Sequence, residues 1–179
     1  MNTENLNLIH LTPEWREELL ALAEDFQAGG DPRFNGLLKG GEEAFFTYLR
    51  DLADEASEED LPPGIIPQTT FWLVRGEKAL LGFSRLRHRM GENLLEKGGQ
   101  ISVEIRPSER GKGYENVLLR LTLEQAAAMG MTEVTLTCAE EDGDAAARIE
   151  AAGGELVETR SLRRSNRLIR IYRLSLQAE

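Results

Sequence analysis

The sequence predicts an α/β fold in which helices flank a sheet. Short runs rich in β-branched, aromatic and leucine residues alternate with longer segments whose apolar residues recur every three or four positions. In the centre of the chain the segments follow the order strand, glycine loop, helix, strand, helix, strand. That order implies a pair of parallel strands joined through a helix.

The first third of the chain predicts one strand followed by two helices. Residues 6–11 alternate as a short strand, and Thr12 followed by Pro13 is typical of a helix start. That helix should end at Gly29-Gly30, and a second helix should cover residues 42–53. The inward-facing residues of the second helix are expected to be Phe45, Phe46, Leu49 and Leu52.

An acidic segment follows the second helix. Residues 51–60 carry six acidic side chains and no basic one, and Pro62-Pro63-Gly64 comes after them. Like charges repel and prolines interrupt regular structure, so we expect an exposed, mobile connection here.

The remaining residues predict most of the sheet and two further helices. Gly76 to Lys78 is short enough to join two strands as a hairpin. The expected strands are residues 69–75, 79–87, 100–105, 132–138, 155–159 and 167–176, and the expected helices are 114–129 and 142–152.

The length of 179 residues predicts a single domain spanning residues 1–179, and the formal charge is −10. This charge is uneven. Residues 1–69, with the first strand, the helices and the acidic loop, hold 15 acidic and 4 basic side chains, whereas residues 70–179 hold 16 and 17. An acidic chain argues against nucleic acid as a partner, because nucleic-acid binders normally present a basic surface.

Several other classes of protein are disfavoured. The single cysteine, Cys138, allows no intrachain disulfide, which favours the reducing cytoplasm as the location. No apolar run is long enough to span a membrane, so we expect no membrane partner. His10 and His88 form no cluster with the spacing of metal ligands, so we expect no metal.

The segment most informative about chemistry is Ile105-Arg-Pro-Ser-Glu-Arg-Gly-Lys-Gly-Tyr114, which opens directly into a helix. Gly111 and Gly113 let a ligand approach the backbone, and the first N–H groups of a helix attract anions. Arg110 and Lys112 add positive charge beside them. We therefore expect an anion site, of the kind that binds pyrophosphate.

Three pyrophosphate ligands compete for this site. A P-loop needs Lys followed by Ser or Thr, but Gly113 follows Lys112. A dinucleotide fingerprint needs a small residue at position 116, where Asn116 stands. Coenzyme A remains, beside the structural alternative of a glycine turn that only caps a helix.

The run Ser108-Glu-Arg-Gly-Lys-Gly113 matches the pattern [Q/R]-x-x-G-x-[G/A] except at its first position. On this run and its place between a strand and a helix, residues 69–160 resemble the GNAT superfamily of N-acetyltransferases. The longer run to Tyr114, after Gly98-Gly99, is similar to a bacterial subgroup of predicted acetyltransferases. The resemblance implies a single-domain fold with a mixed, mostly antiparallel sheet, in which strands 100–105 and 132–138 form a parallel pair.

The resemblance also implies acetyl-CoA as the co-substrate. In this family the splayed strand before the glycine loop polarises the thioester carbonyl through its backbone. The acetyl-CoA-binding residues that the resemblance implies are Val103, Ile105, Arg110, Gly111, Lys112, Gly113, Tyr114 and Asp142.

Three positions depart from the family pattern. Ser108 replaces the usual Gln or Arg, a change we expect to be tolerated because the loop binds through its backbone. Asp142 stands where an asparagine is common near the pantetheine arm, and an ionised carboxylate donates no hydrogen bond. Ile149 stands where many members carry a tyrosine that protonates the leaving thiolate, so the general acid is unassigned or is solvent.

Two side chains are candidates for the base that removes a proton from the amine. Glu104 shares one strand face with Gln100 and Ser102 and is the only titratable group among them. The structural alternative for Glu104 is a salt bridge with a neighbouring arginine. His88, after strand 79–87, is a weaker candidate, since a lone histidine among basic residues is more often structural.

The resemblance implies an N-acetyltransferase that moves the acetyl group of acetyl-CoA to a primary amine of a small molecule or peptide by direct attack. The departures at Asp142 and Ile149 leave an alternative open, a CoA-binding regulatory or interaction module with weak or no catalysis. Residues 1–69 usually form the acceptor side in this family, so their charge predicts a cationic acceptor. Dimers are common in the family, which implies a homodimer, and fold alone leaves the acceptor open.

Overall fold

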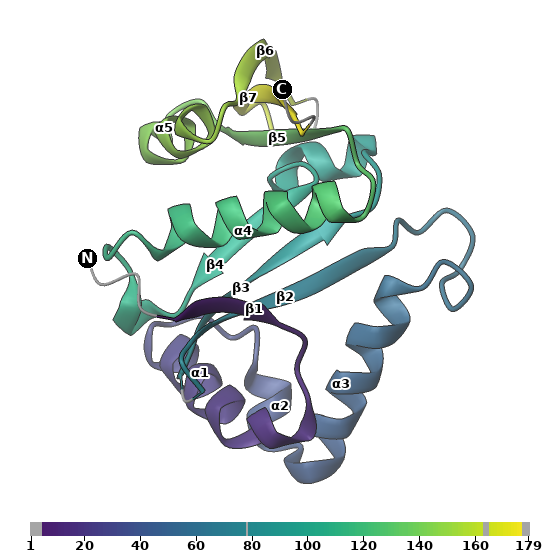
Figure 1. Ribbon diagram of the computed structural model, residues 1–179, viewed down its shortest axis with the longest axis vertical. Helices are drawn as coiled ribbons and strands as arrows, with labels where there is room; N and C mark the ends of the chain where they lie inside the picture. Colours follow the sequence, from purple (N-terminus) through teal and green to yellow (C-terminus); the bar gives the residue numbers. More distant parts are fainter. Residues whose placement is uncertain (1–4, 78, 163–164, 177–179) are drawn as a thin grey trace.

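The computed structural model describes residues 5–77, 79–162 and 165–176, and its strands form two antiparallel sheets. The first sheet has the order β1 (Leu6–Ile9), β2 (Gln68–Arg75), β3 (Ala79–Arg87) and β4 (Ile101–Ile105). The second has the order β5 (Glu133–Ala139), β7 (Leu168–Ser175) and β6 (Glu155–Ser161). Figure 1 shows helix α4 (Tyr114–Ala128) between the two sheets. The expected α/β class, with helices around a largely antiparallel sheet, is confirmed.

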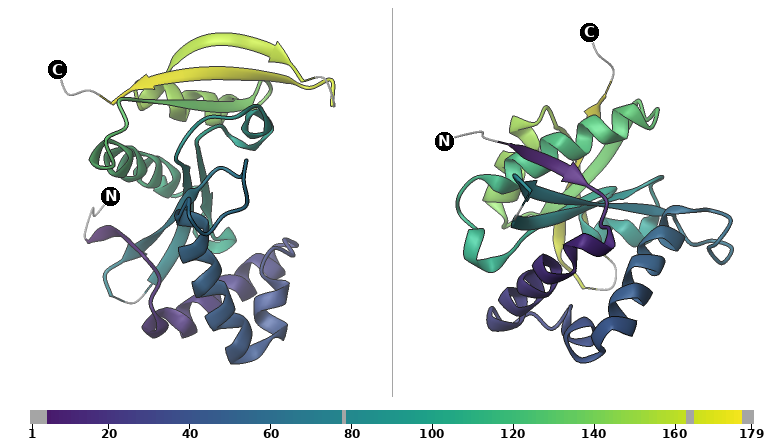
Figure 2. Two further views of the ribbon diagram at one scale, coloured as in Figure 1. Left: turned by 90° about the vertical axis from the view of Figure 1, so that its right-hand side faces the viewer. Right: turned by 60° about the horizontal axis from the view of Figure 1, so that its bottom comes forward.

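Helices cover both faces of the first sheet. One face packs against α1 (Arg16–Ala28), α2 (Asn35–Lys39) and α3 (Gly41–Ala56), and the other packs against α4. Helix α5 (Gly143–Ala151) packs against the second sheet, whose β6–β7 hairpin extends along one end of the molecule (Figure 2). Short 3-10 helices cover Pro13–Trp15, Glu92–Lys97 and Pro107–Glu109. Among the described residues, none of the helices has the length and apolar character that a membrane span requires.

Helix α1 follows the expected pattern. Leu19, Leu22, Ala23 and Phe26 recur at the spacing of one helix face and are all fully buried. They join Trp72 and other residues in the core beneath the first sheet. The helix ends at Gly29, as expected, so the N-terminal helices are fixed to the sheet by a continuous apolar layer.

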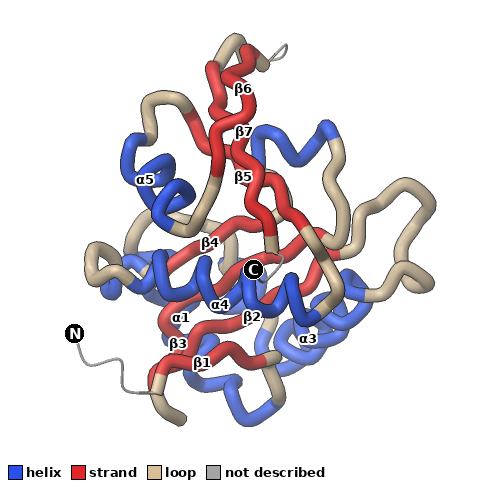
Figure 3. The backbone as a smooth tube through the Cα atoms, turned by 45° about the horizontal axis from the view of Figure 1, so that its top comes forward, coloured by secondary structure: helices blue, strands red, loops and turns tan. Residues whose placement is uncertain are grey.

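The expected parallel pair is wrong, because every strand ladder among the described residues is antiparallel. β4 and β5 are linked only near their adjacent ends, by a bridge between Gly99 and Leu136. The left-handed backbone of Gly98 and Gly99, with φ of +88° and +77°, turns the chain before β4 begins. Beyond this turn the two strands diverge, and Figure 3 shows the two sheets running in different directions.

The N-terminal third differs from expectation in three places. α3 continues to Ala56, so the first half of the acidic segment is helical rather than a loop. Phe46 is 48% exposed, because Phe45 takes the inward position and successive helix residues point about 100° apart. The short helix α2 was not predicted, since five residues are too few for a periodic signal.

The glycine loop after β4 is anchored to α1 by a half-buried ion pair. Arg106 donates from Nε to Oδ2 of Asp25 at 2.8 Å, and its other nitrogens donate to the carbonyl oxygens of Leu80 and Ala21. Ser108 donates to the same Asp25 oxygen from Oγ, at 2.5 Å, and from its backbone N–H, at 3.2 Å. Burial alone would raise the pKa of Asp25, but the hydrogen bonds from Ser108 and Arg106 hold that pKa below its usual value.

We expect Gly99→Ala to destabilise the fold at the turn before β4. A Cβ at Gly99 would lie 2.4 Å from the carbonyl oxygen of Thr135, on top of the strain of a positive φ. Gly30→Ala is the control, because Gly30 has a φ of +84° but nothing within 4 Å of the added Cβ. In urea unfolding, Gly30→Ala should cost about 1 kcal/mol and Gly99→Ala roughly 2 kcal/mol more. Equal losses would contradict the close approach of the two strands.

We expect Asp25→Asn to lower the free energy of unfolding by about 2 kcal/mol at pH 7, because a carboxylate with several donors becomes a neutral amide. A group whose pKa is lowered in the folded state stabilises above its usual pKa and loses that effect as the pH falls through the folded value. The difference from wild type should therefore shrink below the usual pKa of 3.8. Denaturant titrations between pH 3 and 7 measure it, with the exposed Asp51→Asn as control. A difference independent of pH would contradict this role.

Candidate active site

The backbone of the glycine loop forms an open cradle at the start of α4. Gly111 and Gly113 have φ values of +74° and +83°, which side-chain-bearing residues rarely adopt. Gly113 is the N-cap residue, and no side chain caps the helix there. A Cβ built on Gly111 would meet nothing within 4 Å. The N–H groups of the first turn are therefore available to an anion, as the sequence predicts.

The charged side chains of the loop take different positions from those that the sequence suggests. Arg110 folds back, and its Nε donates to the carbonyl oxygen of Ile105 at 2.9 Å. Lys112 forms an ion pair with Glu109 at 2.8 Å. Arg75, at the end of β2, donates to the hydroxyl of Tyr114 at 2.9 Å and was missed because it lies 39 residues away in sequence. A ligand at this loop would meet the backbone N–H groups and, at the rim, the cationic side chains of Arg75, Arg110 and Lys112.

One edge of β4 is unpaired. The backbone N–H of Arg87 donates to the carbonyl oxygen of Gln100, and the backbone N–H of Arg106 donates to that of Leu81, so the even-numbered residues of β4 bond to β3. By alternation, the backbone groups of Ile101, Val103 and Ile105 point to the opposite edge. Apart from the Ile105 carbonyl oxygen, which accepts from Arg110, that edge has no hydrogen-bond partner among the described residues and can bond a ligand. Val103 and Ile105, for which the resemblance implies acetyl-CoA contacts, have their backbone groups on this edge.

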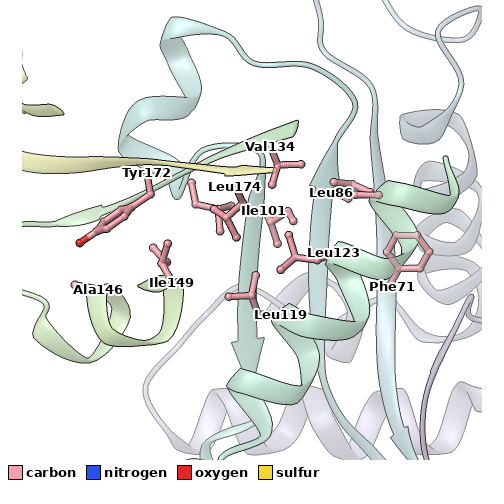
Figure 4. Packing of buried hydrophobic residues seen from close by; sticks show 12 residues of the cluster. Phe71, Leu86, Ile101, Leu119, Leu123, Val134, Ala146, Ile149, Tyr172 and Leu174 are labelled. Atoms are coloured by element: carbon pink, nitrogen blue, oxygen red, sulfur yellow. The ribbon is translucent and has the colours of Figure 1, made fainter. Parts of the chain in front are cut away.

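A cavity of about 160 Å³ opens beside this edge, where β4 and β5 separate. Figure 4 shows the packed side chains around it, with Ile101 of β4, Leu119 of α4 and Ile149 of α5 converging. The cavity is lined by Gly98, Ile101, Ser102, Val103, Leu119, Leu136, Thr137, Ala145, Arg148 and Ile149. It lies along β4, and its lining comes from β4, β5, α4, α5 and the turn before β4.

The positions that depart from the family pattern now have structural roles. Asp142 caps α5, where its Oδ1 accepts from the N–H of Ala145 at 2.9 Å. Ile149 is buried and lines the cavity. Tyr172, the tyrosine nearest to Ile149, donates to Glu150 and points its hydroxyl away from Leu119 (Figure 4). Burial and that hydrogen bond raise the pKa of Tyr172. Within the described chain, no tyrosine lines this cavity.

A second cavity, of about 540 Å³, lies on the opposite face of the first sheet, beside the end of α3. Ser102 lines both cavities, so the two lie on either side of β4 at this residue. The lining comes from α3, the segment after it, β2, β3, the 3-10 helix Glu92–Lys97 and β4: Glu55, Leu61, Ile65, Ile66, Gln68, Arg85, Arg87, Asn93, Leu94, Lys97, Ser102 and Glu104.

The two candidate bases lie on opposite faces of the first sheet. Glu104 lines the larger cavity, and its Oε1 lies 3.3 Å from Nη1 of Arg33, in the loop after α1. Arg33 was missed because it is 71 residues away in sequence. His88 continues the row of β3 residues that face α4. There its Nε2 forms a hydrogen bond with Oγ1 of Thr69 at 2.8 Å. Burial lowers the pKa of His88. The structure thus brings Glu104, but not His88, to the larger cavity.

A third cavity, of about 220 Å³, adjoins Cys138 at the end of β5. Burial, together with the negative charge of Asp142, raises the pKa of the Cys138 thiol, so the reactive thiolate is disfavoured at neutral pH. In the described part of the chain, no group of three or more histidine, cysteine or acidic residues has the arrangement of a metal site.

Solved structures of N-acetyltransferases have the same fold. A spermidine N-acetyltransferase chimera from Vibrio cholerae and hSSAT has 16% identity and a TM-score of 0.61, over 96% of this chain and 95% of that one. A ribosomal-protein-S5-alanine acetyltransferase from Vibrio fischeri has 11% identity and a TM-score of 0.68, over 98% and 95%. A microcin C7 self-immunity acetyltransferase in complex with acetyl-CoA and AMP has 13% identity and a TM-score of 0.63, over 97% and 93%. At these identities the likeness shows the fold alone.

Sequence comparison defines the family. No curated protein sequence matches the chain. The model of the acetyltransferase (GNAT) family matches residues 37–153, which is more than half of the chain. The matched range includes the glycine loop, Glu104 and every residue that lines the cavity of about 160 Å³. Members of this family are acetyltransferases that use acetyl-CoA as the donor. The chain belongs to the GNAT acetyltransferase family.

Proposed function

We propose that the protein transfers the acetyl group of acetyl-CoA to a primary amine of a small molecule or peptide, by direct attack. The observation that carries this proposal is the position of two cavities on either side of β4, both lined by Ser102. One cavity lies beside the free edge of β4 and suits the donor, and the other lies across β4 and is lined by the carboxylate of Glu104. A donor and an acceptor that enter from opposite faces of one strand can react directly.

Three parts of the site fit the donor: the glycine loop, the free edge of β4 and the N–H group of Val103. The backbone of Gly111, Lys112 and Gly113 suits the pyrophosphate, because its N–H groups lie at an uncapped helix start. The free edge of β4 suits the amide groups of the pantetheine arm, which would bond to it as an added strand does. Val103 offers its N–H at that edge, where it would polarise the thioester carbonyl.

Acetyl transfer then needs a neutral amine. The amine nitrogen attacks the thioester carbonyl carbon, the new C–N bond forms, the C–S bond breaks, and CoA leaves as the thiolate. Glu104 is the proposed acceptor of the amine proton, directly or through water, because it is a carboxylate in the acceptor cavity. Water is the proposed proton source for the thiolate, since a thiol with a pKa of about 8.5 is a good leaving group.

The second candidate is a CoA-binding module with weak or no catalysis. Ile149 favours it, because a buried aliphatic side chain lines the donor cavity where many family members have a tyrosine. The two candidates differ in one measurement, the release of free thiol from acetyl-CoA on addition of a panel of amines. Thiol release that depends on an amine supports the enzyme, and acetyl-CoA binding without such release supports the module.

We further propose a homodimer located in the cytoplasm. The β6–β7 hairpin exposes the apolar side chains of Leu156, Val157 and Leu168, which would be covered in a dimer. The single cysteine suits a reducing compartment. Light scattering on wild type and on Val157→Glu tests the dimer, and a monomeric wild type would contradict it.

Gly111→Val should weaken acetyl-CoA binding without unfolding the protein. A β-branched residue is disfavoured at a φ of +74°, and its side chain would fill the space in front of the loop. We expect the KM for acetyl-CoA to rise at least about tenfold. Gly153→Ala, at a φ of +96° with open surroundings at the end of α5, is the control. An unchanged KM in the Gly111 variant would rule out the loop as the pyrophosphate site.

Glu104→Gln should lower kcat by about 100-fold, because an amide cannot accept the proton. The KM for acetyl-CoA should stay the same, because Glu104 lies on the face opposite the donor cavity. Arg33→Gln, which removes only the ion-pair partner, should change kcat much less. Full acetyl transfer by Glu104→Gln would show that Glu104 is a structural partner of Arg33 and not the base.

A further inference from the structure

The ionisable groups of the larger cavity are not balanced. Of its two carboxylates, Glu104 pairs with Arg33, and Glu55 accepts a hydrogen bond from Nε2 of the neutral Gln68 at 2.8 Å. None of its three cationic side chains, those of Arg85, Arg87 and Lys97, forms an ion pair with a residue that the structure describes. The cavity is therefore positive, although the chain as a whole is acidic.

Arg87 is buried without a counter-charge among the described residues. The residue is only 6% exposed. Its three hydrogen bonds all come from Nη1, which donates to the carbonyl oxygens of Lys97 and Gly99 and to Oγ of Ser102, at 3.2–3.4 Å. Its Nε is buried with no partner among the described residues. A buried guanidinium in this state costs free energy that an anion would recover.

Arg85 adds a second charge on the same strand face, two residues away. The pairing of β3 with β4 places Arg85 directly opposite Ser102, which lines both cavities. Its Nε is also buried without a partner, and its guanidinium carbon lies 5.7 Å from the centre of the Phe83 ring. Burial, and then the positive charge of Arg85, lower the pKa of Arg87. Two neighbouring guanidinium groups that repel each other would both gain from an anion between them.

We propose that the acceptor carries a carboxylate as well as an amine, and that Arg85 and Arg87 bind this carboxylate. The inference rests on the proposed function and specifies its substrate class. The planar guanidinium matches the geometry of a carboxylate and can donate two parallel hydrogen bonds to it. With the carboxylate at the arginines, the amine of the acceptor lies towards Ser102 and Glu104.

Four apolar side chains form part of the remaining wall of the cavity, beside the polar Gln68 and Asn93. Leu61, Ile65 and Ile66 follow α3, and Leu94 comes from the 3-10 helix before β4. Arg89 holds this wall in place, because it pairs with Glu58 and donates to the carbonyl oxygen of Ile65. An apolar side chain would pack here, so the class that fits the whole cavity is a free apolar amino acid.

This acceptor differs from the cationic one that the charge of residues 1–69 predicts. Most acidic residues of that segment lie outside the cavity lining, which takes only Glu55 from it. A polyamine would place a second ammonium group near Arg85 and Arg87, where it would be repelled. The local charge of the cavity, and not the net charge of the segment, decides which group is bound.

The test compares each free amino acid with its carboxamide, which keeps the amine and removes the carboxylate. Leucine, isoleucine, phenylalanine, methionine, their carboxamides and spermidine are offered at saturating acetyl-CoA, and thiol release gives kcat/KM. At least one acid should exceed its amide by about 100-fold. In Arg85→Gln this ratio should fall close to one through a higher KM for the acid, with the KM for acetyl-CoA unchanged. Arg120→Gln, an exposed arginine on α4, should keep the wild-type ratio.

Calorimetry provides a second readout that does not need turnover. N-acetyl-leucine and its amide are titrated into wild type and Arg85→Gln in the presence of CoA. Binding of the acid alone, lost in the variant, supports the proposal. A preference for amides or spermidine, or an acid preference that survives in Arg85→Gln, overturns it while the acetyltransferase function stands. Absence of amine-dependent thiol release overturns the proposed function instead, and the titration then decides the carboxylate site by itself.

Discussion

The separation of β4 from β5 is the constraint on which the rest of the site depends. The two strands meet at the bridge between Gly99 and Leu136 and then diverge, because the glycine turn redirects the chain before β4 begins. An unpaired strand edge is normally a liability in a folded protein. Here the edge is enclosed between α4 and α5, so its backbone groups form one wall of the donor cavity.

The same turn connects the donor and the acceptor sides. Arg87 reaches under it to the carbonyl oxygens of Lys97 and Gly99, and also to Ser102, which lines both cavities. At the other end of β4, Arg106 and Asp25 attach the glycine loop to α1. Both ends of this five-residue strand are therefore fixed by arginines that β3 or the loop supplies. A rigid β4 would keep the thioester and the amine close together and correctly oriented. Such positioning is a large part of what an enzyme contributes to a bimolecular reaction.

The sequence was sufficient for the glycine loop, the order of the strands and longer helices, and the strand face that carries Glu104. These follow from local signals: glycines before a helix, apolar periodicity and strand alternation. The resemblance implies a splayed strand before the glycine loop, but local signals do not show where β4 and β5 diverge, because strand pairing depends on distant residues and the positive φ of Gly98 and Gly99 becomes informative only beside β5.

The charges of the acceptor cavity were also beyond sequence reasoning. Arg85 and Arg87 alternate with Ser84 and Leu86, so the strand pattern shows that the two arginines share a face. It does not show that α3 and the segment after it cover that face, leaving Arg87 buried. Likewise, the ion pair between Arg33 and Glu104 joins a helix connection to a strand 71 residues later, and only the fold brings them together.

A crystal structure with bound CoA tests the central claim most directly. We expect the pyrophosphate at the N–H groups of Gly111 to Gly113 and the pantetheine arm along the free edge of β4. The sulfur should lie beside Ser102, facing the cavity that Arg85 and Glu104 line. A CoA molecule bound elsewhere, or a pantetheine arm whose sulfur points away from Ser102, would contradict it.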